Sequence, residues 1–379
     1  MKRLITIFLL GLTLAPTPSE GKRIKTISSQ EGISNNAILS MHQNDLGHLF
    51  LGTMDGLNIW NGHSMTTFDA ADGKNYFYGN KVRHIVPGKD SNLFLLTTYG
   101  LARLDMISRE VKFFNDLAFS DIFTITEDEN IFSISSHNEL QYLNIETSEL
   151  TTYPGAAIKN DEECHRMSIM EDGRLCIFTS RNIYLISINY DNTPTVRKTE
   201  CLNIPCKYVA PGYDGIYHFL ITEDNTLSRF DRTDGSLETI TDIESHIIEE
   251  DQVTGIIPLA SHWVFGFRSS GVKTLAHGSR KLEDTDINCS VLTLIPDKKQ
   301  PIVWTGTDCN GLIRWSDSTT DISCVTFEQL PYSIKMPVRS IYLDKEDTLW
   351  FGTKGDGLFR IRDFSKNTSF DTSNTERYT

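Results

Sequence analysis

Eight side chains at recurring positions are the best candidates in this sequence for binding a polar ligand. Arg83, Arg166 and Arg339 each lie near the start of an apolar, strand-like segment. Five more lie in turns that follow such segments: Tyr99, Arg181, Arg268, Asp308 and Lys354. Guanidinium and carboxylate groups form bidentate hydrogen bonds, and a tyrosine ring can stack on a sugar. If they converge, these side chains predict a site for an acidic or neutral glycan. The alternative is that each arginine ties neighbouring strands together.

Motifs for catalysis are absent from the sequence. It contains no G-x-S-x-G, no H-E-x-x-H, no P-loop and no kinase signature. The glycine-rich segment 355–357 follows a strand-like run and precedes no helix, so it does not indicate a phosphate site. The acidic residues are scattered through turns, and the densest run, 127–129, is expected to face solvent. We therefore predict no catalytic residue, no metal, no cofactor and no enzymatic activity.

The charge balance restricts the partners that the chain can have. Asp and Glu number 50 against 36 Lys and Arg, which gives a formal net charge of −14. Such a chain repels nucleic acid and anionic membrane surfaces, so neither is a predicted partner. After the first 20 residues, no apolar stretch is long enough to cross a bilayer. The mature chain is predicted to have no membrane span.

The N-terminus has the pattern of an export signal. Lys2 and Arg3 precede a short apolar stretch at 4–14, and small residues follow up to Gly21. We predict a signal peptide over residues 1–21 and a periplasmic or secreted mature chain. A retained membrane anchor is the alternative, which the shortness of the apolar stretch disfavours.

The seven cysteines do not form a recognisable disulfide or zinc pattern. Their number is odd, they are spread over strand-like segments, and no C-x-x-C pair occurs. Only Cys201 and Cys206 are close enough in sequence to suggest a local bridge. Buried free thiols are the preferred interpretation.

An internal repeat of roughly 40 to 45 residues runs through the chain. Segments 38–60 and 338–359 align almost in step, with Leu-Phe-Leu-Gly-Thr at 49–53 matching Leu-Trp-Phe-Gly-Thr at 349–353. Six further segments carry the same pattern more loosely: 82–104, 122–143, 167–185, 208–230, 253–275 and 291–315. The sequence therefore contains eight units.

Each unit is expected to form four short antiparallel strands joined by polar or glycine-containing turns. This spacing predicts an all-β fold, a β-propeller whose blades are four-stranded antiparallel sheets. We predict seven blades over residues 22–330 and an extra, eighth repeat unit over 331–379, with an eight-bladed ring as the alternative. Residues 23–27 alternate like a strand and are expected to complete the last blade and fasten the ring, unless the mature N-terminus is untethered. In a propeller, loops entering first strands share a face with turns between second and third strands, which would place the eight candidate residues together.

The units at both ends resemble the two-component regulator propeller repeat. The resemblance is carried by residues 38–60 and 338–359, with 291–315 as a third good match and the Gly-Ile-Ser-Asn-Asn opening at 32–36 as a further typical feature. It implies the periplasmic sensor of a hybrid two-component system, many of which detect oligosaccharides. Members usually have two seven-bladed propellers, a β-sandwich, a membrane span, a histidine kinase and a response regulator. This sequence has neither a span nor a kinase, and its eighth unit matches the first blade of a second propeller.

Three functions follow, from different classes. The first is a ligand-sensing propeller, the truncated sensor part of a carbohydrate-responsive regulator, whose partners would be an oligosaccharide and a second propeller or sensor kinase. The second is a scaffold that binds protein partners or self-associates through the open edge of the eighth unit. The third, and least favoured, is a propeller enzyme such as a polysaccharide lyase, which would need a His and acid pair on one face.

Overall fold

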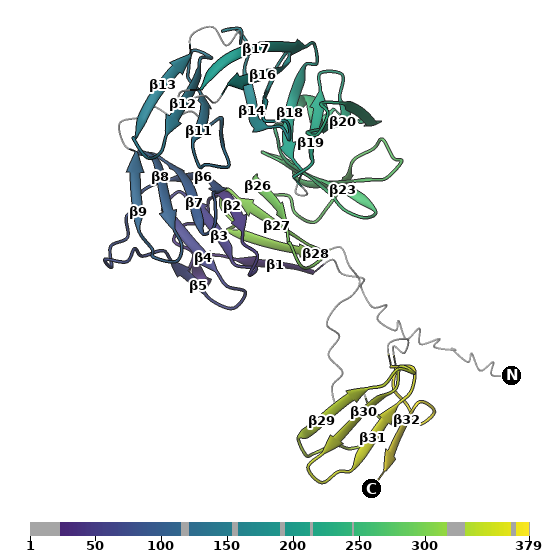
Figure 1. The fold of residues 1–379 in the computed structure, drawn as a ribbon. Helices are drawn as coiled ribbons and strands as arrows, with labels where there is room; N and C mark the ends of the chain where they lie inside the picture. Colours follow the sequence, from purple (N-terminus) through teal and green to yellow (C-terminus); the bar gives the residue numbers. More distant parts are fainter. Residues whose placement is uncertain are drawn as a thin grey trace, which may run out of the picture. The chain divides into compact units, whose positions relative to one another are not determined.

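The computed structural model describes residues 23–114, 121–153, 158–189, 194–212, 215–244, 246–316, 330–364 and 369–378. The predicted signal peptide at 1–21 lies outside the described residues. The chain divides into two compact units, residues 1–317 and 318–379 (Figure 1). Within the described part, no helix is long and apolar enough to cross a membrane.

The first unit consists of seven four-stranded antiparallel sheets. The first four sheets are β2 (Ile38–Gln43), β3 (Leu49–Thr53), β4 (Gly56–Trp60) and β5 (Met65–Thr67); β6 (Val82–Pro87), β7 (Asn92–Thr97), β8 (Gly100–Asp105) and β9 (Val111–Phe114); β10 (Phe123–Ile125), β11 (Ile131–Ile134), β12 (Leu140–Asn144) and β13 (Glu149–Tyr153); and β14 (Cys164–Ile169), β15 (Leu175–Thr179), β16 (Ile183–Asn189) and β17 (Thr195–Leu202). The next two are β18 (Cys206–Pro211), β19 (Tyr217–Thr222), β20 (Thr226–Asp231) and β21 (Leu237–Asp242); and β22 (Val253–Pro258), β23 (His262–Phe267), β24 (Gly271–Ala276) and β25 (Glu283–Asp284). The seventh combines β1 (Arg23–Ile27) with β26 (Val291–Pro296), β27 (Ile302–Thr307) and β28 (Leu312–Ser316).

The hydrophobic core of this unit lies between the sheets. Each buried cluster joins two consecutive sheets; in one, for example, Phe50 of the first sheet packs with Leu95 of the second. The series continues around the unit and ends with a cluster in which Trp304 of the seventh sheet joins Leu51 of the first. Strands β26 and β2 are also in contact. The seven sheets therefore form a closed ring of blades.

The ring is fastened by its N-terminal strand. Strand β1 pairs antiparallel with β28, from Ile24 opposite Trp315 to Ile27 opposite Leu312. Two segments of the chain that lie roughly 290 residues apart in sequence thus complete one blade. The prediction of seven blades with 23–27 in the last of them is confirmed, and the strand does not serve an eighth blade.

The innermost strands share a local irregularity. In six of the seven sheets the register shifts at the second residue of the inner strand, a β-bulge that places Leu39, Arg83, His165, Lys207, Thr254 and Leu292 opposite no single partner. A bulge turns the side chain of the extra residue and ends regular pairing. In these six sheets the bulge residue at the start of the inner strand is therefore not required for regular strand pairing.

The second unit is a single sheet: β29 (Val338–Leu343), β30 (Leu349–Thr353), β31 (Leu358–Ile361) and β32 (Thr375–Tyr378). It repeats the same design, including a bulge at Arg339. Its small core contains Leu330, Ile334, Phe351, Phe359 and Ile361. This is the predicted eighth repeat unit, and it forms a body of its own.

Closure by β1 gives the first prediction. Replacing Ile27, which is 1 % exposed and packs with Leu312 and Trp304, by alanine should lower the free energy of unfolding of the first unit by about 2 to 4 kcal/mol. The matched control is Ile24→Ala on the same strand, where the side chain is 36 % exposed and the loss should stay below about 1 kcal/mol. Urea denaturation followed by tryptophan fluorescence measures both. Equal losses in the two variants would contradict closure through Ile27.

Candidate functional site

In every blade the loop entering the inner strand lies beside the turn between the second and third strands. A backbone N–H at the end of the second strand donates to a carbonyl just before the inner strand; Thr98 to Lys81 (3.2 Å), Ser180 to Glu163 (2.8 Å), Arg268 to Gln252 (2.8 Å) and Asp308 to Ser290 (3.1 Å) are examples. These hydrogen bonds confirm that the loops entering the inner strands and the turns between second and third strands share one face of the ring.

A cavity of about 740 Å³ opens on this face, bordered by the second to sixth sheets. This volume lies in the ordinary range for small-molecule sites. Its polar lining comes from the loops that enter the inner strands and from neighbouring turns: His84, Asp121, Glu163, His165, Lys207, Tyr208, Glu223, Glu249, Asp251 and Gln252. The bulge residues His165 and Lys207 are among them.

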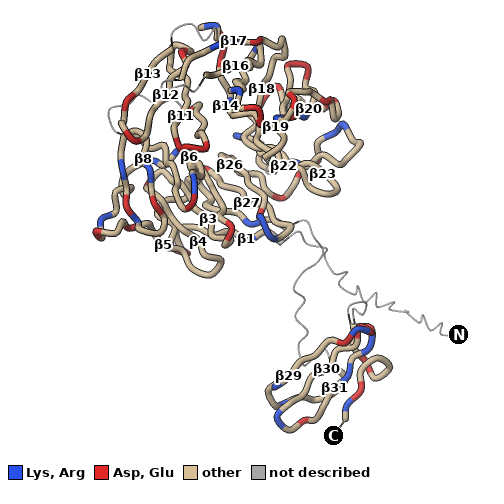
Figure 2. Tube along the Cα trace, in the orientation of Figure 1, with Lys and Arg blue, Asp and Glu red and all other residues tan. Residues whose placement is uncertain are grey.

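Acidic side chains outnumber basic ones in the cavity lining. Five carboxylates face one ammonium group, that of Lys207. Along the chain as a whole, acidic and basic residues are interspersed (Figure 2). The concentration of carboxylates is therefore a property of this cavity, and it favours neutral or cationic ligands over anionic ones.

At one edge of the cavity an aspartate is neutralised by an arginine of the neighbouring blade. Asp121 lies 2.7 Å from the Arg83 guanidinium and 3.7 Å from Nε2 of His84. Burial lowers the pKa of His84; Asp121 opposes this shift, and the positive charges of Arg83 and Arg166 add to it. His84 is thus a neutral ring at neutral pH and can exchange hydrogen bonds without carrying charge.

At the other edge a polar chain joins the fifth and sixth blades. Lys207 donates to the Asn225 side-chain oxygen (2.8 Å), and the Asn225 amide donates to Glu249 (3.0 Å). Burial raises the pKa of Asp251, but hydrogen bonds from Ser270 and Ser269 outweigh this effect and hold that pKa below its ordinary value. The Asp251 carboxylate therefore remains ionised at neutral pH.

The two thiols in the cavity wall are poor nucleophiles. Burial, with help from Glu162 and Glu163, raises the pKa of Cys164 to about 12. Burial and Glu223 raise the pKa of Cys206 to about 12 as well. A nucleophilic cysteine needs a lowered pKa, so these thiols do not provide covalent chemistry here. Among the residues that the structure describes, no three His, Cys, Asp or Glu side chains are grouped to hold a metal ion.

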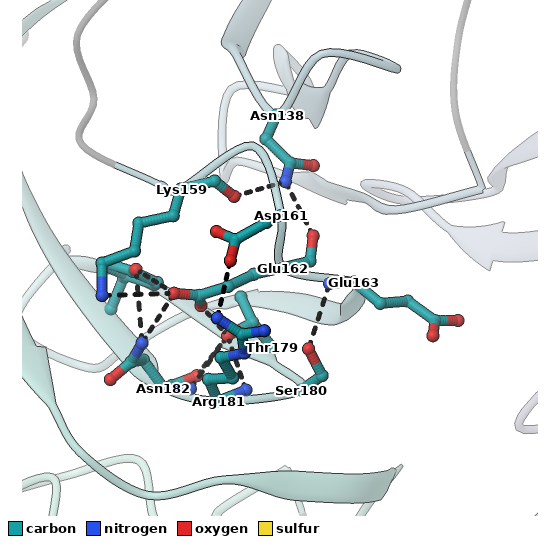
Figure 3. A network of polar contacts seen from close by, with 10 residues as sticks. Asn138, Lys159, Asp161, Glu162, Glu163, Thr179, Ser180, Arg181 and Asn182 are labelled. Atoms are coloured by element: carbon teal, nitrogen blue, oxygen red, sulfur yellow. Dashed lines mark hydrogen bonds and ion pairs between the residues drawn. The ribbon is translucent and has the colours of Figure 1, made fainter.

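Two adjacent glutamates have opposite roles at the cavity rim (Figure 3). The side chain of Glu162 is fully buried and accepts hydrogen bonds from Thr179 Oγ1, Asn182 Nδ2 (2.7 Å) and the Tyr184 hydroxyl (2.9 Å). In Figure 3 the Glu163 side chain points away from this network, and it lines the cavity. Glu162 therefore supports the loop through buried hydrogen bonds, and the neighbouring Glu163 lines the cavity.

The same loop is tied to the preceding blade. Asn138 of the third sheet donates to the backbone carbonyls of Lys159 (2.8 Å) and Glu162 (2.7 Å). Sequence reasoning did not single out the Asp161-Glu162-Glu163 run, although its place directly before an inner strand was a usable signal. It also expected Glu129 to be solvated. That expectation is wrong, because Glu129 is 8 % exposed and pairs with Arg103 of the neighbouring blade at 2.8 Å.

Six of the eight predicted residues belong to the first unit, and none of the eight lines the cavity. Arg83 contacts Asp121 at its edge, Arg166 lies on β14 next to the bulge, and Arg181 pairs with Asp161 at 2.6 Å outside it. The exposed turn residues are Tyr99, Arg268 and Asp308, and the last two predicted residues, Arg339 and Lys354, belong to the second unit. Ligand binding by these eight residues stays a prediction, and the structure adds the carboxylates of the cavity as further candidates.

The fold and cavity define a propeller with a ligand-sized opening at the mouth of its ring, and comparisons with known proteins agree with that class. The sequence profile of the two-component regulator propeller matches residues 333–355. The predicted resemblance is thus confirmed for the eighth unit. No curated protein sequence matches the chain significantly.

Solved structures show the same fold. The extracellular domain of a putative hybrid two-component system from B. thetaiotaomicron matches with a TM-score of 0.54 and 16 % identity, over 95 % of this chain and 53 % of that one. A putative one-component system from B. thetaiotaomicron gives 0.55 and 13 %, over 92 % and 47 %. Virginiamycin B lyase from Staphylococcus aureus gives 0.55 and 12 %, over 78 % and 99 %. The chain spans about half the length of the two extracellular domains, and at these identities the likeness establishes the propeller fold alone.

The rim network gives the second prediction. Glu162→Ala removes the buried carboxylate that accepts hydrogen bonds from three buried donors, so the free energy of unfolding should fall by about 2 to 4 kcal/mol. Glu163→Ala removes a neighbouring carboxylate with no such buried partners and should change stability by less than about 0.5 kcal/mol. Urea denaturation of both variants provides the comparison. If the two variants lose similar stability, the assigned division of roles is incorrect.

Proposed function

We propose that this chain is an extracytoplasmic ligand-sensing propeller that binds a neutral oligosaccharide in the acidic cavity at the mouth of its ring. The observation that carries the proposal is the cavity itself, with five carboxylates and a tyrosine within about 740 Å³. Sugar hydroxyls are donors that ionised carboxylates accept well, and sugar faces pack against aromatic rings. The negative lining disfavours the acidic glycans that the arginine pattern also allowed.

Binding without catalysis is part of this proposal. Burial raises the pKa of both thiols in the cavity wall to about 12, and the Asp251 carboxylate is held in hydrogen bonds with the protein. The likeness to extracellular domains of two-component and one-component systems supports a sensing role. Because the fold is also similar to that of a lyase, the experiment must test for enzymatic activity as well. A carbohydrate-responsive regulator would use the propeller in this way.

The test is a thermal-shift screen of the mature chain against neutral, acidic and amino-sugar oligosaccharides. A ligand that binds only the native state raises the melting temperature, by a few degrees at about 100 times its dissociation constant. Neutral oligosaccharides should give the shift and acidic ones should not. Glu163→Gln should reduce the shift without altering the melting temperature of the free protein, whereas Glu146→Gln, an exposed glutamate in a turn between third and fourth strands, should leave it intact.

Other outcomes of this screen would overturn the proposal. If only acidic oligosaccharides raise the melting temperature, the arginine side chains and not the cavity carboxylates would be the binding site. Cleavage of the bound oligosaccharide, detected by mass spectrometry, would make the propeller an enzyme. No shift from any neutral oligosaccharide, with a well-folded sample, would remove the cavity as a glycan site.

A second candidate function, an interaction scaffold, is favoured by the surface of the second unit. Its inner strand exposes Ile341 (70 %), Tyr342 (65 %) and Leu343 (50 %). At the matching positions of β2, Met41 and Gln43 are only 7 % and 5 % exposed, because neighbouring blades cover them. An exposed apolar strand of this kind marks an interaction surface. We propose that the same strand of a second copy of the chain binds there.

Self-association through this face has a direct test. The mature chain should form dimers in light scattering coupled to size-exclusion chromatography, and Ile341→Lys should shift the population toward the monomer. Ile107→Lys is the matched control, since Ile107 is an isolated, 83 % exposed residue of the first unit. A chain that stays monomeric at its highest soluble concentration, or a dimer unaffected by Ile341→Lys, would rule out this interface.

A further inference from the structure

Two cysteines of the seventh blade are brought together by strand pairing. Val291 on β26 pairs with Thr307 on β27, and the pairing continues one residue outward, where the Asp308 N–H donates to the Ser290 carbonyl (3.1 Å). The next residues along the two chains are Cys289 and Cys309. Both cysteines lie in the bends just beyond the paired strands. Opposite residues of an antiparallel pair have Cβ atoms about 4.5 to 5.5 Å apart, and a disulfide needs about 3.5 to 4.5 Å, so a bridge requires a small local approach of the two bends.

Both thiols approach the same amide side chain. Cys309 Sγ donates to Oδ1 of Asn310 at 3.5 Å. Burial raises the pKa of Cys289, a hydrogen bond with the Asn310 side chain opposes this rise, and the neighbouring Cys309 adds to it. Both thiols therefore lie beside the Asn310 side chain.

Neither cysteine of the pair is fully buried. Cys309 is exposed and Cys289 is half-buried, whereas Cys176 and Cys206 are fully buried. The local bridge that sequence spacing suggested, between Cys201 and Cys206, is not favoured, because Cys201 is exposed and Cys206 lies in the core of the fourth and fifth blades. Within the pair, an oxidant in solution therefore reaches Cys309 before Cys289.

We propose that Cys289 and Cys309 are a redox-active pair that closes to a disulfide at the ring seam. The Cys309 thiolate attacks a small-molecule disulfide such as oxidised glutathione and releases one thiolate. The Cys289 thiolate then attacks the Cys309 sulfur and releases the second. Two cysteine thiols thus lose two electrons and two protons, and the oxidant gains both and becomes two thiols.

The position of the pair gives the bridge a structural consequence. The turn that holds Cys309 and Asn310 continues to Gly311, whose N–H donates to the Asn36 carbonyl (3.0 Å) in the loop that enters the first blade. The bridge would fix this turn to the loop that enters the seventh blade. Oxidation therefore stiffens the point where the last and first blades meet, and reduction releases it.

The experiment compares the mature chain after full reduction and after incubation with oxidised glutathione. Peptide mapping should find a peptide pair linked through Cys289 and Cys309, with Cys176 and Cys206 still present as thiols. In Cys289→Ser, Cys309 should instead retain glutathione as a stable mixed disulfide, because the resolving thiol is missing. In Cys201→Ser, the matched control, the linked peptides should form as in the original chain.

Thermal unfolding supplies a second readout. Oxidation should raise the melting temperature of the first unit by several degrees in the original chain and in Cys201→Ser, and by nothing in Cys289→Ser. The proposal is overturned if Cys309 keeps glutathione while Cys289 is present and remains a thiol. A bridge from Cys309 to any other cysteine would overturn it equally.

Discussion

The rest of the structure depends on one constraint: a four-stranded sheet of this repeat buries its faces only against another sheet of the same kind. Every core cluster of the first unit is shared by two consecutive blades, and the last cluster returns to the first blade. Ring closure is therefore part of the core and not an addition to it. The second unit shows the converse, because its described residues form a single sheet, so no other sheet of that unit covers its first strand, and Ile341 and Tyr342 are exposed.

Closure also decides where function can be placed. Since strands and sheet faces are occupied by packing, residues free to bind a ligand are confined to loops and to the bulges at the start of the inner strands. Glu162 and Glu163 show the division within two residues, one buried among Thr179 and Asn182 and the other lining the cavity. A carboxylate at the rim can be held ready for a ligand because the adjacent carboxylate carries the hydrogen bonds that fix the loop.

The fold was largely predictable from the sequence, and the site was not. A repeat of four alternating strands can satisfy its backbone hydrogen bonds and bury its apolar faces in few ways, so the propeller class and its eight repeat units followed from spacing. The count of seven blades rested on the family resemblance and left an eight-bladed ring as the alternative, which the pairing of residues 23–27 with β28 resolves. The site depends on contacts between loops of different blades, which spacing does not contain. Arg83 and Arg181 were selected by residue type, yet the structure pairs them with Asp121 and Asp161 from segments about 40 and 20 residues away. Glu129 was assigned to solvent for the same reason, because its partner Arg103 belongs to another blade.

The location of the cavity suggests how occupancy could be communicated. Each core cluster joins only two sheets, whereas the cavity lining is drawn from five of them, from His84 of the second to Asp251 of the sixth. A ligand held there would add contacts between blades that otherwise communicate only through their immediate neighbours. Binding would then reduce the relative motion of the inner strands without changing any blade, because the cores between blades are already packed.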